Sequence, residues 1–181
     1  MGKIRIISGK FKSRLISFPD KIKNLRPTHD RIREDLFNWL MFDIENKKCL
    51  DLFAGSGAIG FEAISRNAKS VTMIEINKTA YLELIRNQKN LQCQNINITN
   101  SNAINYLNQS IEKFDLIFLD PPYDSILLET ILQIIINKKN LYQNTLIYLE
   151  TNKNLDLSDF KIIKNKQTSS IFYMLIQLKQ E

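Results

Sequence analysis

The chain has 181 residues, of which 44% are hydrophobic and 24% charged, and its formal net charge is +6. These values predict one globular domain with a real core, and no apolar stretch is long enough to cross a bilayer. Cys49, Cys93 and His29 are too few for a disulfide framework or a zinc site. We therefore expect a reduced, cytoplasmic protein with no metal and no membrane contact.

The positive charge lies mostly in the first part of the chain. Residues 1–33 carry ten Lys or Arg side chains and two acids, which favours a polyanion as the partner. A basic surface without a partner is the alternative. Residues 4–8 and 14–18 predict a small hairpin, and apolar positions between Thr28 and Leu40 recur at helical spacing. We therefore expect a basic N-terminal extension made of one hairpin and one helix.

Strands and helices alternate from Cys49 onward, which predicts a parallel sheet with helices on both faces. Strands are expected at residues 49–53, 70–74, 96–100, 114–119 and 145–150, and helices at 58–66, 78–91, 103–108 and 126–138. Two further strands, 160–164 and 171–178, predict a closing antiparallel hairpin. We place one boundary near residue 45, between the extension (1–45) and an α/β domain (46–181).

A glycine-rich turn follows the first strand of the α/β domain. Gly55, Gly57 and Gly60 match the pattern G-x-G-x-x-G, and Glu75 ends the next strand about twenty residues later. The pattern is typical of dinucleotide sites, so a nicotinamide oxidoreductase is one hypothesis. The same turn also serves S-adenosylmethionine, which has a ribose but no pyrophosphate.

Three further positions favour S-adenosylmethionine. Asp51 lies within the strand before the glycines, where a carboxylate could face the ammonium group of the methionine part but would repel a pyrophosphate. Asn102 follows the third strand, where its side chain can hydrogen-bond to an adenine edge. Asp120 follows the fourth strand. Because the carboxyl ends of parallel strands meet at one edge of a sheet, these residues predict a methyltransferase.

The sequence Asp120-Pro121-Pro122-Tyr123 can hold a planar exocyclic amine. Asp120 offers an acceptor, the prolines have fixed φ angles and no N–H, and Tyr123 offers a ring for stacking on a flipped base. A turn without function is the alternative. These residues alone do not choose between N6 of adenine, in RNA or DNA, and N2 of guanine. The chain has no room for a separate target-recognition domain, so the basic extension is the candidate recognition surface.

Segments 5–14, 25–34 and 36–40, together with Asp51–Gly60 and Asp120–Tyr123, resemble the RsmD family. These bacterial enzymes methylate N2 of one guanine in small-subunit ribosomal RNA. The resemblance covers nearly the whole chain and implies S-adenosylmethionine as donor and a Rossmann-like class I methyltransferase fold. It also implies 16S rRNA in a partly assembled 30S subunit as substrate, and a monomer is our default. An assembly factor without activity is an alternative, and the Asn- and Lys-rich C-terminal segment matches poorly.

The motifs and the resemblance together imply three groups of site residues. The catalytic residues are Asp120, Pro121, Pro122 and Tyr123. The cofactor-binding residues are Asp51, Phe53, Ala54, Gly55, Ser56, Gly57, Glu75, Asn102 and Ala103. The RNA-binding residues are Lys10, Lys12, Arg14, Arg26, Thr28, Arg31 and Arg33. For the two last arginines an exposed helix face is the alternative; Trp39 is expected to pack in the core, and Glu62 and Arg66 to form a surface pair.

Overall fold

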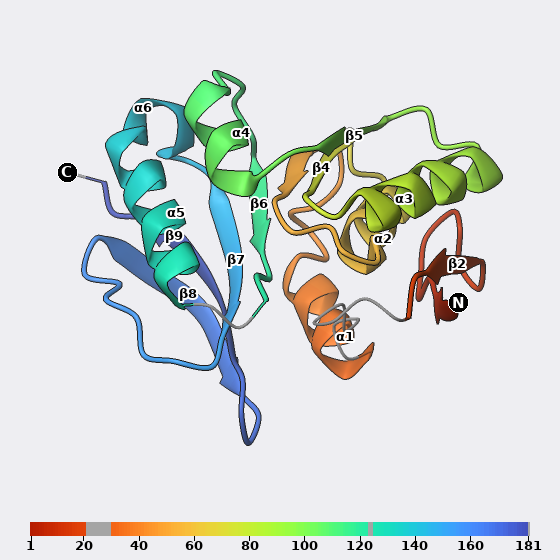
Figure 1. Ribbon diagram of the computed structural model, residues 1–181. Coiled ribbons are helices and arrows are strands. Elements are labelled where there is room, and N and C mark those ends of the chain that lie inside the picture. The colour runs from red at the N-terminus through yellow and green to blue at the C-terminus, as the bar shows by residue number, and fades with distance from the viewer. Residues whose placement is uncertain (21–29, 123–124, 181) are drawn as a thin grey trace.

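A computed structural model describes residues 1–20, 30–122 and 125–180 (Figure 1). The strands are β1 (Gly2–Arg5), β2 (Leu15–Phe18), β3 (Lys48–Asp51), β4 (Ser70–Glu75), β5 (Ile96–Asn100), β6 (Leu116–Leu119), β7 (Leu146–Thr151), β8 (Phe160–Gln167) and β9 (Phe172–Leu178). The helices are α1 (Asp30–Trp39), α2 (Ala58–Ser65), α3 (Lys78–Leu91), α4 (Ala103–Gln109), α5 (Ser125–Asn137) and α6 (Lys139–Tyr142). Within the described residues, no helix is long and apolar enough to span a membrane.

One large sheet has the strand order β5-β4-β3-β6-β7-β9-β8, and β1 and β2 form a separate pair. Strands β3 to β7 are parallel, whereas β9 runs antiparallel to both β7 and β8. Leu50 of β3 lies opposite Thr72 of β4 and Ile117 of β6, so β3 is central. This is the predicted parallel sheet with a closing antiparallel hairpin.

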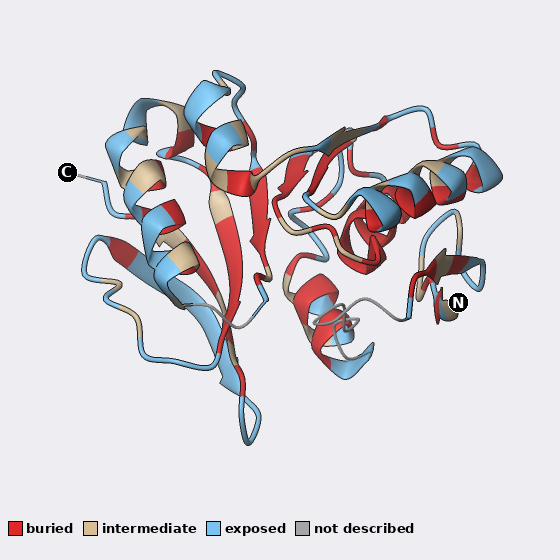
Figure 2. Cartoon of the chain, in the orientation of Figure 1, coloured by how far each residue is buried: buried red, intermediate tan, exposed pale blue. Residues whose placement is uncertain are grey.

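Helices cover both faces of the sheet, and the core lies between them and the strands (Figures 1 and 2). Successive side chains of a strand point to opposite faces. Phe118 and Tyr148 therefore pack in the cluster that contains α1, α2 and α3, while Ile117 and Ile147 pack in the cluster that contains α4, α5 and α6. Strand β6 is buried on both faces, which explains its unbroken apolar sequence.

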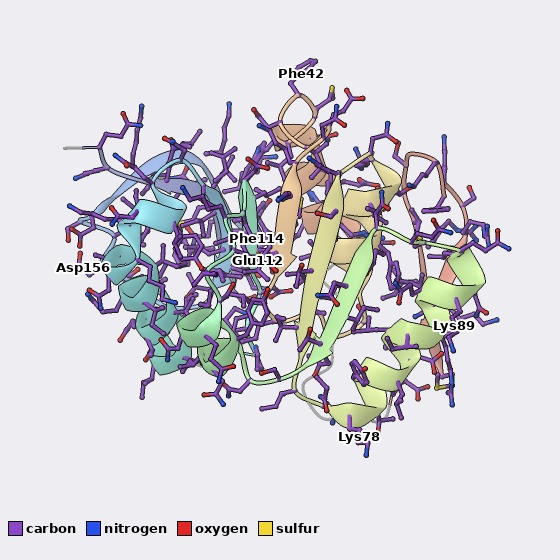
Figure 3. The ribbon with its side chains drawn as sticks, turned by 90° about the horizontal axis from the view of Figure 1, so that it is seen from above. Phe42, Lys78, Lys89, Glu112, Phe114 and Asp156 are labelled. Atoms are coloured by element: carbon purple, nitrogen blue, oxygen red, sulfur yellow. The ribbon has the colours of Figure 1, made fainter. Side chains whose placement is uncertain are left out.

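Two asparagines start the helices that follow β4 and β5. The side chain of Asn77 accepts hydrogen bonds from the backbone N–H groups of Thr79 and Ala80, at 2.9 and 3.1 Å, and so caps α3. Helix α3 then runs along one side of the molecule, with Lys78 and Lys89 near its two ends (Figure 3). These caps fix where each helix begins relative to the strand before it.

The N-terminal hairpin is fastened to α2 by a buried carboxylate. Glu62 is 0% exposed, and its two oxygens accept the N–H groups of Ile7 and Ser8 at 2.7 and 3.0 Å. The Nε atom of Arg66 donates to the same carboxylate at 2.8 Å. The prediction of a surface pair between Glu62 and Arg66 is therefore wrong. Strand β1 also ends earlier than predicted, because Ile7 and Ser8 bond to Glu62 and not to a partner strand.

The loop of the same hairpin lies against the end of α2. Gly9 has a φ angle of +81°, and a Cβ atom there would come within 1.9 Å of the Ser65 carbonyl oxygen. The next two residues donate backbone N–H groups to Ser65, Lys10 to its carbonyl oxygen at 2.8 Å and Phe11 to its Oγ at 3.0 Å. These contacts show how the extension packs. Whether residues 1–45 form a separate unit stays a prediction.

Helix α1 connects the extension to the C-terminal hairpin. Asp35 accepts hydrogen bonds from the Tyr173 hydroxyl at 2.7 Å and from Lys166 Nζ at 2.6 Å. Trp39 stacks on Tyr173 with 5.5 Å between ring centroids, and its partly buried ring packs against the core, as predicted. The turn between β8 and β9 projects beyond the rest of the sheet (Figure 1).

Candidate active site

The predicted cofactor and catalytic residues gather at one edge of the large sheet. Asp51 and Glu75 end the neighbouring strands β3 and β4, Asn102 follows β5, and Asp120 follows β6. The order β5-β4-β3-β6 places these four strand ends side by side. The carboxyl edge of a parallel sheet is where such folds bind ligands.

The glycine turn between β3 and α2 needs a small residue at Gly57. This residue has a φ angle of +81°, which side chains rarely adopt, and it directly precedes α2. A Cβ atom at this position would lie 2.6 Å from Leu84 Cδ2 and 2.7 Å from the ring of Phe61. The backbone N–H of Gly57 bonds back to the Ala54 carbonyl oxygen at 2.6 Å, which closes the turn. The turn is therefore held tightly against α3.

Glu75 holds the same turn in place. One carboxylate oxygen accepts the N–H of Gly55 at 2.8 Å, and the other accepts the N–H of Asn77 at 2.7 Å. Burial raises the pKa of Glu75, while these backbone hydrogen bonds oppose the shift. Because an ionised carboxylate offers about four lone pairs, two backbone bonds leave acceptor capacity for ribose hydroxyls.

Asn102 uses its side chain to cap α4. Its Oδ1 atom accepts the N–H groups of Ile104 and Asn105 at 2.9 and 3.4 Å. A contact between this side chain and an adenine edge would therefore come through the amide nitrogen, a hydrogen-bond donor. Ala103 is buried as the first residue of α4.

Four carboxyl groups influence one another at this edge. Burial, together with the negative charges of Asp120 and Glu75, raises the pKa of Asp51 to about 7. Burial and Asp120 raise the pKa of Glu150 in β7 to about 8, while the Tyr148 hydroxyl donates to Glu150 Oε1 at 2.7 Å. Within the described residues no group of such side chains could hold a metal ion. The edge is therefore acidic, and it suits hydroxyls, amines and cations better than phosphates.

Asp120 follows the strand that pairs directly with β3. Phe118 lies opposite Asp51, so Asp120 comes two residues beyond the partner of Asp51. The Asp120 side chain is half-buried, Pro121 is buried and Pro122 is exposed. The predicted stacking residue Tyr123 lies outside the described residues. Of the remaining cofactor assignments, Phe53 is half-buried, whereas Ala54 and Ser56 are buried in the turn.

The predicted RNA-binding residues have different environments. Lys10, Lys12, Arg14 and Arg31 are exposed, as a phosphate contact requires. One guanidinium nitrogen of Arg14 donates to the Asn90 carbonyl oxygen at 2.8 Å, so this side chain also fastens the hairpin to the end of α3. Two predicted residues, Arg26 and Thr28, lie outside the described residues.

The environment of Arg33 differs from both of those considered for it from the sequence, a phosphate contact and an exposed helix face. It is 1% exposed, and its Nη2 atom donates to the Arg5 carbonyl oxygen at 2.8 Å and to Asp30 at 3.0 Å. Its Nε and Nη1 atoms have no hydrogen-bond partner among the described residues, and burial lowers its pKa. The structure thus places Arg33 between α1 and β1, where its guanidinium contacts protein.

Comparison with known proteins gives the family of the chain. A family model described as "Conserved hypothetical protein 95" matches residues 4–177. "Ribosomal RNA small subunit methyltransferase D" from Buchnera aphidicola is 43% identical over 93% of this chain and 90% of its own length. The proteins of that name from Haemophilus influenzae and Escherichia coli are 39% and 38% identical, over 97% of this chain and 94% and 90% of their own lengths. The chain belongs to the ribosomal RNA small subunit methyltransferase D family. It is a methyltransferase, and the predicted RsmD resemblance is confirmed.

Solved structures agree with membership of the methyltransferase D family. That of yhhF from Escherichia coli has a TM-score of 0.90 and 37% identity, and the match covers 99% of this chain and 100% of that chain. That of HI0767 from Haemophilus influenzae has a TM-score of 0.82 at the same identity and coverage. The predicted class I methyltransferase fold is thereby confirmed, and a methyltransferase replaces the nicotinamide oxidoreductase hypothesis.

The buried Asp51 predicts how the stability of this methyltransferase D homologue depends on pH. Its folded pKa of about 7 lies above the ordinary value, so its favourable contribution is present at low pH and is lost as the pH rises toward 7. We expect the free energy of unfolding to fall by about 2 kcal/mol between pH 5 and pH 7 from this group. Urea unfolding of wild type and Asp51→Asn at pH 5, 6, 7 and 8 measures it. Parallel pH profiles for the two proteins would contradict the assignment.

Proposed function

We propose that the protein transfers a methyl group from S-adenosylmethionine to the exocyclic N2 amine of a guanine in 16S rRNA, within the assembling 30S subunit. The observation that carries this proposal is the position of Asp120. It directly follows β6, and its charge acts on both Asp51 and Glu150. The named relatives are small-subunit rRNA methyltransferases, which supports the same substrate class.

The residues at the carboxyl edge of the sheet fit S-adenosylmethionine. This cofactor carries a sulfonium and an ammonium group, a ribose diol and an adenine, and it has no phosphate. Asp51 is the carboxylate suited to the ammonium group, and Glu75 keeps acceptor capacity for the diol. Asn102 offers an amide donor for the base. The negative charges of Asp120 and Glu75, which also act on Asp51, oppose a pyrophosphate in the same place.

The sequence from Asp120 to Pro121 supplies the acceptors for the guanine amine. Bound S-adenosylmethionine supplies an electrophilic methyl group. Asp120 and the carbonyl oxygen of Pro121 would accept the two N–H hydrogens, which localises on nitrogen the lone pair otherwise delocalised into the ring, so that the N–C bond can form as the S–C bond of the donor breaks and leaves a neutral thioether. The charge of Asp120 also stabilises the positive charge that develops on the nitrogen, and either its carboxylate or water accepts the released proton.

The basic extension provides the polyanion contacts in this proposal. Lys10 and Lys12 are exposed on the hairpin loop that Glu62 and Ser65 hold against α2. Helix α2 begins directly after the glycine turn. Helix α2 thus links the hairpin that would bind RNA to the turn proposed for the cofactor.

Product analysis tests the proposal. Unmethylated 30S subunits, naked 16S rRNA, tRNA and DNA are each incubated with labelled S-adenosylmethionine, and the modified nucleosides are separated. N2-methylguanosine formed on 30S subunits is the expected result. Methyladenosine would keep the chemistry of Asp120 and overturn the choice of base. No product on any substrate would overturn the proposal and favour an assembly factor without activity.

A further inference from the structure

Strand β8 is an exposed edge strand of the large sheet, and all of its charged side chains are positive. Every residue from 161 to 170 is exposed, whereas most of the neighbouring strand β9 is buried. Three lysines, Lys161, Lys164 and Lys166, lie on β8, and the strand contains no acid. The nearest acids earlier in the chain are Asp156 and Asp159, which precede the strand.

A bulge in β8 brings the three lysines to the same face of the sheet. In a regular strand, residues 161 and 164 would point to opposite faces, because their spacing is odd. The register shifts between Ile162 and Lys164, so Lys161, Lys164 and Lys166 lie opposite Gln177, Leu175 and Tyr173. These partners alternate along β9 and therefore share one face, the α1 side, where Leu175 and Tyr173 pack. We call Lys161, Lys164 and Lys166 the lysine row.

The lysine row leads to the level of the candidate active site. Lys166 lies opposite Tyr173, and Tyr173 lies opposite Glu150, whose pKa is raised by the charge of Asp120. Lys164 lies opposite Leu175, which lies opposite Tyr148, so Lys164 and then Lys161 lie progressively further from that level. Strands β6, β7, β9 and β8 follow one another in the sheet, so three strand spacings, or about 14 Å, separate the strand end before Asp120 from Lys166, the near end of the row. That span is short enough for the RNA strand that carries the target base to reach both.

Protection of the sheet edge is the competing explanation. Lysines and bulges on edge strands prevent pairing with another chain. Edge protection, however, does not require the lysines to share a face, and the bulge is what makes them share it. Only Lys166 among them has an acidic partner within the described residues, since it binds Asp35 at 2.6 Å. Lys161 and Lys164 therefore keep uncompensated charge on one surface, which is complementary to a phosphate backbone.

We propose that the lysine row binds backbone phosphates of the rRNA segment next to the target guanine. This inference rests on the proposed function and adds a second RNA contact surface. The two edge strands of the sheet are β5, which lies under α3, and β8, which carries the lysine row. The N-terminal hairpin and the lysine row would then hold the RNA at two places, with the strand end before Asp120 between them.

The test compares two double variants with the same change of charge. In Lys161→Gln/Lys164→Gln the row loses its two uncompensated lysines, while Lys166 keeps its bond to Asp35. In Lys69→Gln/Lys113→Gln two exposed lysines are removed before β4 and β6, at the amino ends of the strands. Binding to unmethylated 30S subunits is measured between 50 and 300 mM salt, together with S-adenosylmethionine binding and thermal unfolding.

We expect the row variant to bind 30S subunits about tenfold more weakly, with a log–log salt slope smaller by about 1.4, which corresponds to two lost phosphate contacts. The control should keep the wild-type slope. Equal losses in both variants would mean that only overall charge matters, and no loss in the row variant would mean no contact; either result overturns the inference. The inference would also be overturned if the row variant aggregated while its monomer bound 30S subunits normally. That is the result expected if the lysines only protect the sheet edge. Failure of the wild type to form N2-methylguanosine contradicts the proposed function separately.

Discussion

Replacing Asp120 by alanine is expected to slow methyl transfer about 10²- to 10⁴-fold, with little change in S-adenosylmethionine affinity. This is the usual range for the loss of a positioned general base or of a group that stabilises transition-state charge. Asp120 lies after β6, whereas the cofactor assignments Asp51 and Glu75 lie on β3 and β4. Single-turnover methyl transfer to 30S subunits measures the chemical step, and calorimetry measures cofactor binding.

Asp120→Asn separates two roles of the carboxylate. The asparagine oxygen still accepts one N–H from the amine, but the side chain no longer takes up a proton. If Asp120 only holds the amine, the asparagine variant should retain much more activity than the alanine variant. Equal losses in both would assign proton transfer to Asp120. A wild-type rate in Asp120→Ala would remove this residue from the mechanism.

Replacing Glu62 by alanine is expected to lower the free energy of unfolding by about 3 to 5 kcal/mol. The change leaves the part-buried N–H groups of Ile7 and Ser8 and the guanidinium of Arg66 without their acceptor. Losing one partner of a buried charged pair has a cost of this size. Urea unfolding gives the free energy, and hydrogen exchange at the two backbone amides shows whether the hairpin has detached from α2.

Glu83→Ala is the matched control for this variant. Glu83 also lies on a helix and pairs with an arginine, Arg86, at 2.9 Å, but the Arg86 side chain is 70% exposed. Since exposed pairs contribute little, we expect this substitution to lower the free energy of unfolding by about 1 kcal/mol or less. If both variants lose the same stability, the backbone contacts of Glu62 contribute nothing.

The sequence predicts the regular elements well where local sequence signals decide them. The predicted helix 78–91 and strand 96–100 agree with α3 and β5. A capping asparagine marks the start of the helix, and three of the five residues of the strand are β-branched, which favours strands. The parallel direction of strands β3 to β7 follows from the alternation of helices and strands, and the family follows from the motifs at the strand ends and in the N-terminal segments. The short helix α6 was not predicted. The roles of the site residues stay predictions.

Tertiary hydrogen bonds account for the main errors. Glu62 and Arg66 have the spacing of an exposed pair, and nothing local indicates that the carboxylate binds main-chain donors 54 and 55 residues away. A useful signal was that Glu62 is the only charged residue of α2, which is otherwise apolar or small. For Arg33, the signal was its position one turn before Phe37, which is 0% exposed. Glu150 ends the predicted strand 145–150, and the sequence alone assigns no role to its carboxylate.

The contacts of Asp35 set a condition on how the chain folds as it is made. Helix α1 leaves the ribosome early, but Lys166 and Tyr173 lie 131 and 138 residues further along. At ordinary rates of synthesis this is a delay of roughly 7 to 28 s. Throughout that time Trp39 lacks the ring of Tyr173, and the side of α1 that faces β9 lacks its native cover. The last strand to be synthesised is therefore the one that completes the packing of the first helix.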